Sequence, residues 1–237
     1  MPSGKPVMVI TGTSRGIGLE VAKHFLKKGY VIEGCSRHEP ALQEADYNHT
    51  KIDVANEDMV CSWVRDIKKK HKRIDVVINN AGFAPAAVPV LMTKGKLLEE
   101  VLKTNVMGSY FVSREAAVVM VPKRFGRIIN VSSMAVGLHE EGTAAYSASK
   151  SAIVEFTRIM AKELAPLGIT CNVIAPSMYK TEAVEALGEE VIARAIGKLT
   201  IKRTVTIDEI CHILEFLVSP LSGIVTGQVI HMGLISG

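Results

Sequence analysis

Apolar positions follow two alternating patterns along the chain. Short runs rich in valine and isoleucine, apolar at consecutive positions, are typical of strands buried on both faces. The longer segments between them repeat apolar residues every three or four positions, which is typical of amphipathic helices. The predicted strands cover 7–11, 30–35, 49–52, 74–79, 127–132, 169–174 and 227–232. Strands that alternate with helices predict β-α-β units and hence a parallel sheet.

The first predicted helix shows the helical pattern most clearly. Within 16–28, Ile17, Val21 and Phe25 lie on one stripe, and Gly29 is a typical helix stop. Further helices are predicted at 57–71, 95–121, 143–165 and 206–218. Because no linker, repeat or shift in composition divides the chain, we expect one domain. The predicted fold is α/β, a doubly wound (Rossmann) seven-stranded parallel sheet that takes in residues 1–237.

Two segments near the C-terminus carry further signals. Thr206 can cap the last predicted helix while Glu209 reaches back to it. The stretch 175–200 departs from the strand-helix rhythm, because it turns at Pro176 and continues as a charged, mildly amphipathic helix. We interpret 176–200 as a substrate-binding loop or lid, with an ordinary connecting helix as the alternative.

Composition and charge exclude several classes of protein. The chain is 48% hydrophobic and 22% charged, which excludes intrinsic disorder. Its 28 Lys and Arg nearly balance its 24 Asp and Glu. The one basic cluster, 68–73, is interpreted as the solvated end of a helix. Nucleic-acid or membrane binding is the alternative, but no aromatic residue interleaves the cluster to stack on a base.

Location and redox state follow from what the chain lacks. No apolar run approaches the roughly 18 residues of a membrane span, and the N-terminal residues show no signal-peptide h-region, so we expect a cytoplasmic protein. The four cysteines are far apart and form no C-x-x-C, so we expect reduced thiols and no structural metal.

A glycine-rich turn follows the first predicted strand. The segment 11–18 reads Thr-Gly-Thr-Ser-Arg-Gly-Ile-Gly, and the first helix opens inside it. Gly12, Gly16 and Gly18 permit a tight turn and close backbone approach, so that a pyrophosphate can lie against the amides and the positive end of the helix. The order of strand, glycines and helix predicts a dinucleotide site.

Two lookalike motifs suggest other chemistry. Residues 12–16 match the G-x-S-x-G nucleophile elbow of α/β-hydrolases, but little chain precedes Ser14 and no oxyanion segment is present. Residues 147–150 match the S-x-x-K of penicillin-recognising enzymes, but the S-D-N and K-T-G partner motifs are missing. We interpret both as coincidental.

Tyr146 and Lys150 form the reactive pair of the chain. They are four residues apart in a predicted helix, so both side chains emerge from one face. A free tyrosine has a pKa of about 10, and an adjacent ammonium lowers that pKa toward a useful range for proton transfer. A surface tyrosine and lysine on an ordinary helix is the alternative for this pair taken alone.

Five motifs in register give the chain a family resemblance. It resembles the short-chain dehydrogenase/reductase family over essentially its whole length, and within it the classical subgroup that includes 3-oxoacyl-[acyl-carrier-protein] reductases and small ketone reductases. The motifs are Thr11-Gly12-(x)3-Gly16-Ile17-Gly18, Asn79-Asn80-Ala81-Gly82, Asn105, Ser132-Ser133 and Tyr146-(x)3-Lys150.

The resemblance implies four catalytic residues. Tyr146 would be the acid/base, and Lys150 would lower its pKa while binding the nicotinamide ribose. Ser133, thirteen residues before the tyrosine, would bind the substrate oxygen in preference to its neighbour Ser132. Asn105 would hold a water that links the lysine to solvent.

The resemblance also implies a set of cofactor-binding positions, in which Asp53 contacts the adenine ring. Pro176 and Thr181 contact the nicotinamide amide, and Asn79 supports the end of the fourth strand. The full set is Gly12, Ser14, Arg15, Gly16, Ile17, Gly18, Ser36, Arg37, Asp53, Val54, Asn80, Ala81, Gly82, Tyr146, Lys150, Pro176 and Thr181.

Three departures from the family pattern stand out. Pro176 is followed by serine where the family commonly has glycine, and the usual Asp-Gly-Gly near the C-terminus reads Met-Gly-Leu at 232–234. The interval from Arg37 to Asp53 is short, which predicts a truncated helix after the second strand.

The charge of the side chains expected near the adenosine ribose predicts whether NAD(H) or NADP(H) binds. NAD enzymes of this architecture place a carboxylate after the second strand, whereas this chain has Ser36 and Arg37 there, with Arg15 in the glycine turn. Arginines suit a 2′-phosphate, so NADP(H) is expected. Glu33 is the one contrary acidic residue, and its place inside the strand argues against a ribose contact.

The predicted function is NADP(H)-dependent hydride transfer to or from a small-molecule carbonyl or secondary alcohol, the ketone or 3-oxoacyl reductase type. A non-catalytic NADP(H)-binding sensor of the same fold is the alternative. Apolar residues such as Leu91 and Met178 indicate either a ligand with an uncharged body or ordinary packing. The resemblance implies a homodimer or homotetramer, in which 116–120 would supply apolar contacts, or else would pack against the chain's own sheet.

Overall fold

Seven parallel strands form the centre of the molecule. The computed structural model describes residues 4–40, 42–180, 184 and 188–234. The sheet order is β3-β2-β1-β4-β5-β6-β7, and every neighbouring pair is parallel. The strands are β1 (Val7–Thr11), β2 (Val31–Ser36), β3 (Tyr47–Lys51), β4 (Val76–Asn79), β5 (Gly126–Val131), β6 (Ile169–Pro176) and β7 (Val229–Met232). The doubly wound α/β sheet predicted from the sequence is confirmed.

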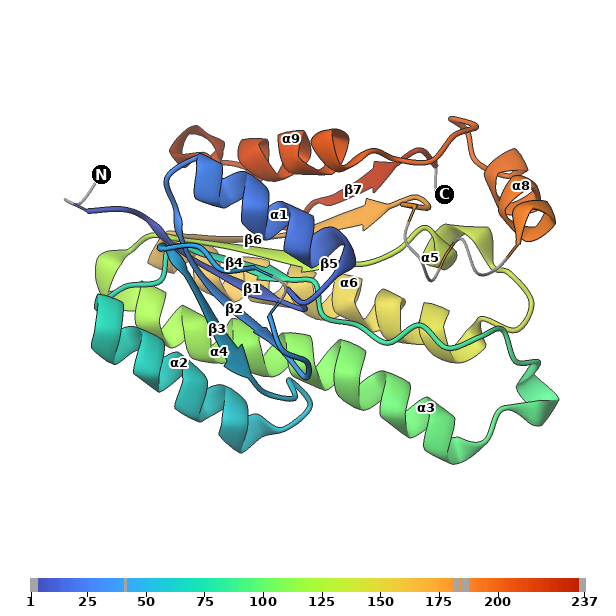
Figure 1. Cartoon of the computed structure of the whole chain (residues 1–237), viewed down its shortest axis with the longest axis horizontal. Helices are drawn as coiled ribbons and strands as arrows, with labels where there is room; N and C mark the ends of the chain where they lie inside the picture. The colour runs from blue at the N-terminus through green and yellow to red at the C-terminus, as the bar shows by residue number, and fades with distance from the viewer. Residues whose placement is uncertain (1–3, 41, 181–183, 185–187, 235–237) are drawn as a thin grey trace.

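Helices cover both faces of this sheet. They are α1 (Gly16–Lys27), α2 (Glu57–His71), α3 (Gly95–Leu102), α4 (Gly108–Met120), α5 (Ala135–Leu138), α6 (Ala144–Leu164), α8 (Glu189–Gly197) and α9 (Ile207–Val218). Figure 1 shows α1 and α9 on one face and α2, α4 and α6 on the other. Two apolar clusters result, one around Phe25 and Leu214 and one around Trp63 and Met120. Because both faces are covered, the central strands β1, β4 and β5 are buried along their whole length.

The long helix predicted at 95–121 is interrupted. A π-helical turn, Lys103–Met107, separates α3 from α4. Such a turn adds a residue to the helical repeat, and π-turns are frequent at functional sites. Here it contains Asn105, whose side chain is fully buried. The prediction of one regular helix was wrong at this point, because apolar periodicity does not reveal a single inserted residue.

Other predicted boundaries agree with the structure to within a few residues. The Thr206 side chain caps α9 and Glu209 completes the capping box. Among the described residues no helix occurs between β2 and β3, so the truncated connection predicted after Arg37 is confirmed. The short helix α5 was not predicted.

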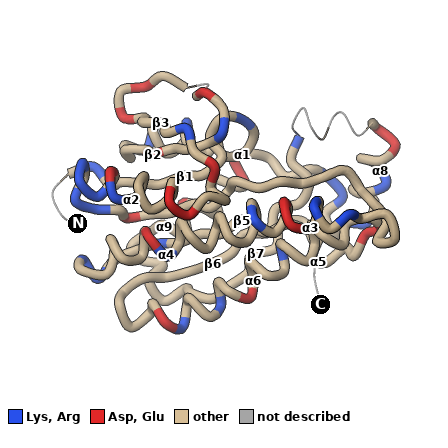
Figure 2. The backbone as a smooth tube through the Cα atoms, turned by 90° about the horizontal axis from the view of Figure 1, so that it is seen from below, with Lys and Arg blue, Asp and Glu red and all other residues tan. Residues whose placement is uncertain are grey.

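The basic cluster 68–73 does end a helix, as Figure 2 shows at one end of α2, but its environment was predicted wrongly. His71 Nε2 lies 2.6 Å from Glu33 Oε1, and Arg73 is buried against Asp75. Buried carboxylates draw these residues inward, because an unpaired buried charge is costly. Only part of the cluster is therefore solvated.

Three structural observations concern a membrane span, a metal site and the cysteines. Within the described ranges, no helix combines the length and apolarity needed to cross a bilayer, and no cluster of His, Cys, Asp or Glu has the arrangement of a metal site. All four cysteines are free, and three of them are buried. The cytoplasmic location stays a prediction.

A buried ion pair joins the starts of the central strands. Arg73 donates from Nε and Nη2 to the two carboxylate oxygens of Asp75, at 2.7 and 2.6 Å. Asp75 Oδ2 also accepts from the Val7 amide at 2.8 Å, and its carbonyl accepts from the Arg127 amide. Asp75 thus aligns β1 through its carboxylate and β5 through its carbonyl, at the edge of the sheet opposite the clefts described below.

Replacement of Asp75 is expected to destabilise the fold strongly. Asp75→Ala leaves the buried Arg73 guanidinium without a counter-charge, so the free energy of unfolding is expected to fall by about 3–5 kcal/mol in urea titrations. The control is Asp66→Ala, whose exposed ion pair with Lys69 spans 3.6 Å and whose loss is expected to cost under about 1 kcal/mol. Equal losses for the two variants would contradict this account.

Candidate active site

The carboxyl ends of β1 and β4 meet where the sheet reverses its winding. Asn80 and Ala81 donate their amides to Thr11 Oγ1, at 3.0 and 2.9 Å, and Asn80 Nδ2 donates to the carbonyls of Thr11 and Gly12. Gly12 has φ +76°, and a Cβ there would lie 2.9 Å from Asn80 Nδ2. Glycine is therefore required at position 12, and the two loops form one unit.

The N-terminus of α1 opens toward these loops without a cap. Arg15 is the N-cap residue, no side chain caps the helix, and its first turn holds no acidic residue. By contrast, Asn56 caps α2 and Thr206 caps α9. Gly18 packs against the Gly12 carbonyl and keeps the turn close to the helix. The uncapped amides and the positive helix end fit the pyrophosphate of a dinucleotide.

A cleft of about 210 Å³, here called the adenosine cleft, adjoins this helix end. It brings together most of the cofactor residues predicted from sequence, and it adds His38, Ile52 and Thr104, which carried no sequence signal. Its lining residues are Gly12, Ser14, Arg15, Ser36, Arg37, His38, Ile52, Asp53, Val54, Asn80, Ala81, Gly82 and Thr104. One Asp53 carboxylate oxygen accepts from the Ala55 amide, and the adenine contact predicted for Asp53 stays a prediction.

A second cleft of about 320 Å³, the reaction cleft, shares Asn80 and Gly82 with the first. The two clefts are thus continuous along the carboxyl edge of the sheet. The lining of the reaction cleft is Ile17, Asn80, Gly82, Ala84, Val131, Ser132, Ser133, Met134, Tyr146, Lys150, Pro176, Ser177, Met178, Tyr179 and Val184. Gly16 and Gly18 line neither cleft, and Thr181 lies outside the described residues.

Helix α6 presents the reactive pair to this cleft. Tyr146 is partly buried in its first turn and lines the cleft together with Ser133. Lys150 is buried one turn later, where Nζ donates to the Val131 carbonyl at 2.8 Å. Its Nζ lies 5.8 Å from the Tyr146 ring centroid, within cation–π range. The predicted spacing thus places serine, tyrosine and lysine together.

Burial changes the proton affinities of the pair. It raises the pKa of Tyr146 above its usual value, which the hydrogen bond from Ser133 only partly offsets. It lowers the pKa of Lys150 to about 8, because the charged ammonium loses water. The pKa of Tyr146 is therefore raised overall, because desolvation is the largest effect on the phenol, and the lowering expected from Lys150 stays a prediction.

The two adjacent serines face opposite ways. Ser133 Oγ accepts from the Ala135 amide and lies within reach of Tyr146. Ser132 Oγ instead donates to the Lys150 carbonyl at 3.1 Å and is buried against α6. Ser133 is therefore the serine available to a substrate oxygen, in line with the spacing to the tyrosine.

Asn105 links three parts of the site. Its Oδ1 accepts from the Phe83 amide at 2.7 Å, and its Nδ2 donates to the Phe83 carbonyl and to Ser149 Oγ at 3.0 and 2.9 Å. A Cβ at Gly82 would lie 3.4 Å from both Asn105 Oδ1 and Lys150 Nζ. Asn105 thus holds the loop after β4 in place. That Asn105 also binds a water molecule stays a prediction. Ser149 was missed as its partner, although it stands inside the discounted S-x-x-K motif.

The residues predicted to bind the ribose 2′-phosphate differ in their exposure. Arg15 and Arg37 are exposed at the adenosine cleft, and within the described part of the chain neither forms a salt bridge. Ser36 is nearly buried, and its hydroxyl donates to the His38 carbonyl at 2.8 Å. Glu33 points away from the cleft to α2, where it pairs with His71, so discounting it as a ribose ligand agrees with the structure.

The departures from the family pattern fit the local packing. Pro176 is the last residue of β6 and pairs with Met232 of β7. The Ser177 amide donates to the Met232 carbonyl at 3.0 Å, and a Cβ at Gly233 would lie 3.1 Å from Ser177 Oγ. The serine thus takes the space that Gly233 leaves, and β7 forms without the usual acidic residue.

The stretch 175–200 starts beside the reaction cleft. Its two ends are joined, because the Val205 amide donates to the Met178 carbonyl at 3.0 Å. Figure 1 shows α8 beyond the carboxyl ends of the strands, at the same end as α5. Residues 181–183 and 185–187 lie outside the described part of the chain, and the role of a lid stays a prediction.

Known proteins with similar sequences are reductases. Residues 12–233 match the family described as enoyl-(acyl carrier protein) reductase. The 3-oxoacyl-[acyl-carrier-protein] reductase FabG of Buchnera aphidicola subsp. Schizaphis graminum is 31% identical over 234 residues, which span 96% of this chain and 96% of that protein.

Solved structures agree over almost the whole chain. ElxO with NADP bound is 28% identical with a TM-score of 0.90 and covers 97% of each chain. An NAD+-bound xylitol dehydrogenase is 28% identical with a TM-score of 0.89 and covers 98% of each chain. Together with the shared motifs, these matches show that the chain belongs to the short-chain dehydrogenase/reductase family and is an oxidoreductase.

Proposed function

We propose that the protein transfers hydride between NADP(H) and a carbonyl or secondary alcohol, with Tyr146 as acid/base. The observation that carries the proposal is that Ser133, Tyr146 and the buried Lys150 line one cleft, with Lys150 Nζ 5.8 Å from the Tyr146 ring centroid, and that this cleft shares Asn80 and Gly82 with the cleft beside the glycine turn. A nicotinamide cofactor, when bound, supplies or accepts the hydride. The chain's own residues then have only to orient the substrate and to move one proton.

Each of the three side chains has a distinct task. Ser133 donates a hydrogen bond to the substrate oxygen and stabilises the charge that develops there. Tyr146 donates its proton to the same oxygen during reduction, or removes it during oxidation. Lys150, with a pKa lowered to about 8, holds its ammonium at the edge of the tyrosine ring and binds the ribose hydroxyls. Asn105 keeps the loop of Gly82 against this lysine.

Cofactor choice rests on the adenosine cleft. ElxO is described with NADP and xylitol dehydrogenase with NAD+, so overall similarity does not decide between them. Arg15 and Arg37 line the cleft, and none of the residues that line it is glutamate. The one lining carboxylate, Asp53, follows β3 rather than β2. Two arginines suit a 2′-phosphate, and the expected preference is for NADP(H).

The substrate is proposed to be a ketone or 3-oxoacyl group. Among the described residues, the lining of the reaction cleft includes Ala84, Met134 and Met178, and Lys150 is its one side chain with a full charge. Of the apolar residues singled out in the sequence, Met178 lines the cleft, whereas Leu91 is fully exposed. The segment 176–200, which starts at this cleft, is proposed to act as the substrate-binding loop.

A homodimer or homotetramer is proposed through α4 and α6. The apolar run 116–120 is mostly buried in the chain's own core, so its predicted role as a contact surface was wrong except at Val118, which is 59% exposed. Beside it, Tyr110 and Ile159 are also exposed, and a hollow of about 360 Å³ lies between the two helices. This face is apolar enough to pair with a second copy.

Loss of the tyrosine hydroxyl is expected to abolish turnover. Tyr146→Phe removes only the transferable proton, so kcat is expected to fall well below a tenth of wild type, a loss of more than about 1.4 kcal/mol, while cofactor binding survives.

Ser133→Ala is expected to lower kcat severely, and the matched control Ser132→Ala only mildly, since the Ser132 hydroxyl binds only backbone. Turnover is followed by NADPH absorbance with a panel of ketones. Micromolar cofactor binding by a wild type that turns over none of them would favour a sensor.

The cofactor preference is expected to depend on the segment after β2. Wild-type kcat/KM is expected to favour NADPH over NADH by at least about tenfold, roughly 1.4 kcal/mol. In Ser36→Asp/Arg37→Ile, a carboxylate replaces the hydroxyl and one guanidinium is lost, so the preference is expected to disappear. A wild type that uses NADH equally well would contradict phosphate recognition by Arg15 and Arg37.

The oligomer is expected to be visible in solution. Light scattering at micromolar concentration is expected to give at least twice the 25.6 kDa chain mass. Val118→Glu places a charge in the apolar face and is expected to shift the particle toward the monomer. Leu221→Glu, at a residue that is also exposed but lies outside this face, is the control. A wild-type particle of one chain mass would overturn the proposal.

A further inference from the structure

The edge strand β3 directs one row of side chains at the segment that follows β2. Its register pairs Gly34 with His49 and Ser36 with Lys51, so alternate residues of both strands share a face. On this face, Tyr47 and His49 lie beneath the glycine turn. Neither Tyr47 nor His49 lines either cleft, and neither has a role in the proton transfer described above.

His49 is the centre of a hydrogen-bond network. Its Nε2 lies 3.1 Å from the His38 carbonyl and 3.2 Å from Ser36 Oγ. Because a carbonyl only accepts, Nε2 carries a proton, so Nδ1 of the neutral ring accepts from Thr13 Oγ1 at 3.4 Å, with the Tyr47 hydroxyl 2.8 Å away. The Tyr47 hydroxyl in turn donates to Thr13 Oγ1 at 2.8 Å. The network therefore runs without a break from the glycine turn to the residues after β2.

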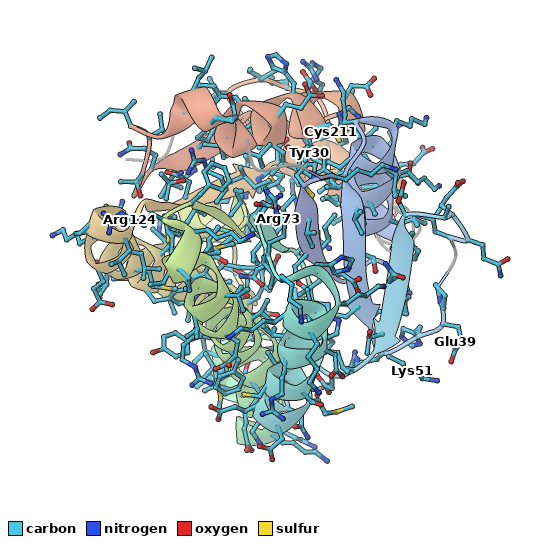
Figure 3. The ribbon with its side chains drawn as sticks, turned by 90° about the vertical axis from the view of Figure 1, so that its left-hand side faces the viewer. Tyr30, Glu39, Lys51, Arg73, Arg124 and Cys211 are labelled. Atoms are coloured by element: carbon cyan, nitrogen blue, oxygen red, sulfur yellow. The ribbon has the colours of Figure 1, made fainter. Side chains whose placement is uncertain are left out.

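The far end of the network immobilises the backbone around Arg37. The Ser36 hydroxyl donates to the His38 carbonyl at 2.8 Å and accepts from the His38 amide at 3.2 Å. Beyond it, Lys51 Nζ forms a salt bridge with Glu39 Oε1 at 2.8 Å, and Figure 3 shows the two side chains together beyond the end of β3. This exposed pair contributes little alone, but it ties down the same turn from the other side.

Gly34 makes room for the network. A Cβ at this position would lie 2.6 Å from Thr13 Oγ1 and 2.9 Å from the Tyr47 hydroxyl oxygen. Thr13 is fully buried and Tyr47 nearly so, so neither side chain has space to withdraw. The packing thus holds the two hydroxyls, and with them the imidazole of His49, in one arrangement.

We propose that His49 is a positioning residue for recognition of the adenosine 2′-phosphate. It fixes the Ser36–His38 turn, so that Arg37 stands at the adenosine cleft beside Arg15 before the phosphate arrives. A guanidinium that is already in place loses less conformational entropy on binding. The inference rests on the proposed use of NADP(H) and extends it to a residue outside the cleft.

The role of His49 is geometric rather than electrostatic. Burial lowers the pKa of His49, against the weaker opposing effects of the His38 carbonyl and Glu39, which favours the neutral imidazole near neutral pH. A neutral ring adds no charge to attract a phosphate. What it supplies is a donor to the His38 carbonyl and, through Thr13, a link to the glycine turn.

The test compares two ligands that differ only in the 2′-phosphate, adenosine 2′,5′-bisphosphate and adenosine 5′-monophosphate, by isothermal titration calorimetry. His49→Leu keeps bulk but removes the hydrogen bonds, so binding of the bisphosphate is expected to weaken about tenfold and that of the monophosphate by less than about twofold. His49→Gln retains a donor toward the His38 carbonyl and is expected to restore most of the difference. Tyr47→Phe, a milder change, is expected to give an intermediate loss.

The control is Asn48→Leu, in the same strand but on its opposite face, which is expected to leave the ratio of the two affinities unchanged. Melting temperatures establish that each variant is folded. Equal weakening of both ligands by His49→Leu, or an unchanged ratio in His49→Leu and Tyr47→Phe, would overturn the role of His49 alone. A wild type that binds the two ligands equally well would overturn the NADP(H) proposal and this inference together.

Discussion

The site depends on the contact between the loops after β1 and β4. Thr11 Oγ1 accepts two backbone amides from Asn80 and Ala81, and the Asn80 side chain donates back to the carbonyls of the first loop. Neighbouring parallel strands whose connections run to opposite faces of the sheet open a crevice at their carboxyl ends. A ligand can bind in this crevice only if its two walls stay at a constant distance. The four hydrogen bonds supply that spacing. They hold the uncapped end of α1 on one side and the Gly82 segment on the other.

The burial of Lys150 is the second constraint. The ammonium has one protein acceptor, the Val131 carbonyl, and it lies in a pocket closed by Gly82 and by the clamp that Asn105 makes on Phe83. Desolvation lowers its pKa to about 8, which brings the lysine close to titration under ordinary conditions. The same burial raises the pKa of Tyr146. The protein thereby keeps the phenol protonated and ready to donate until further charge enters the cleft.

The proposed recognition of NADP(H) has two layers of residues. The outer layer is Arg15 and Arg37, which face the adenosine cleft from different loops. The inner layer is the chain of hydrogen bonds from Tyr47 through Thr13 and His49 to the backbone of His38. With no helix between β2 and β3 in the described chain, the edge strand lies directly beside the turn it supports. The short connection, a departure from the family pattern, is therefore what permits the inner layer.

The sequence by itself determined the sheet, its strands and the order of helices, because apolar periodicity reports local burial directly. It also singled out Ser133 rather than Ser132, through the resemblance to a family in which the serine stands thirteen residues before the tyrosine. It did not reveal the π-turn at Asn105, the partner Ser149 or the burial of Arg73, since each depends on how the helices and strands pack. The direction of the Tyr146 pKa shift was likewise decided only by tertiary structure. Spacing places an ammonium near a phenol, but the amount of water excluded from both depends on how the loops after β4 and β5 close over them.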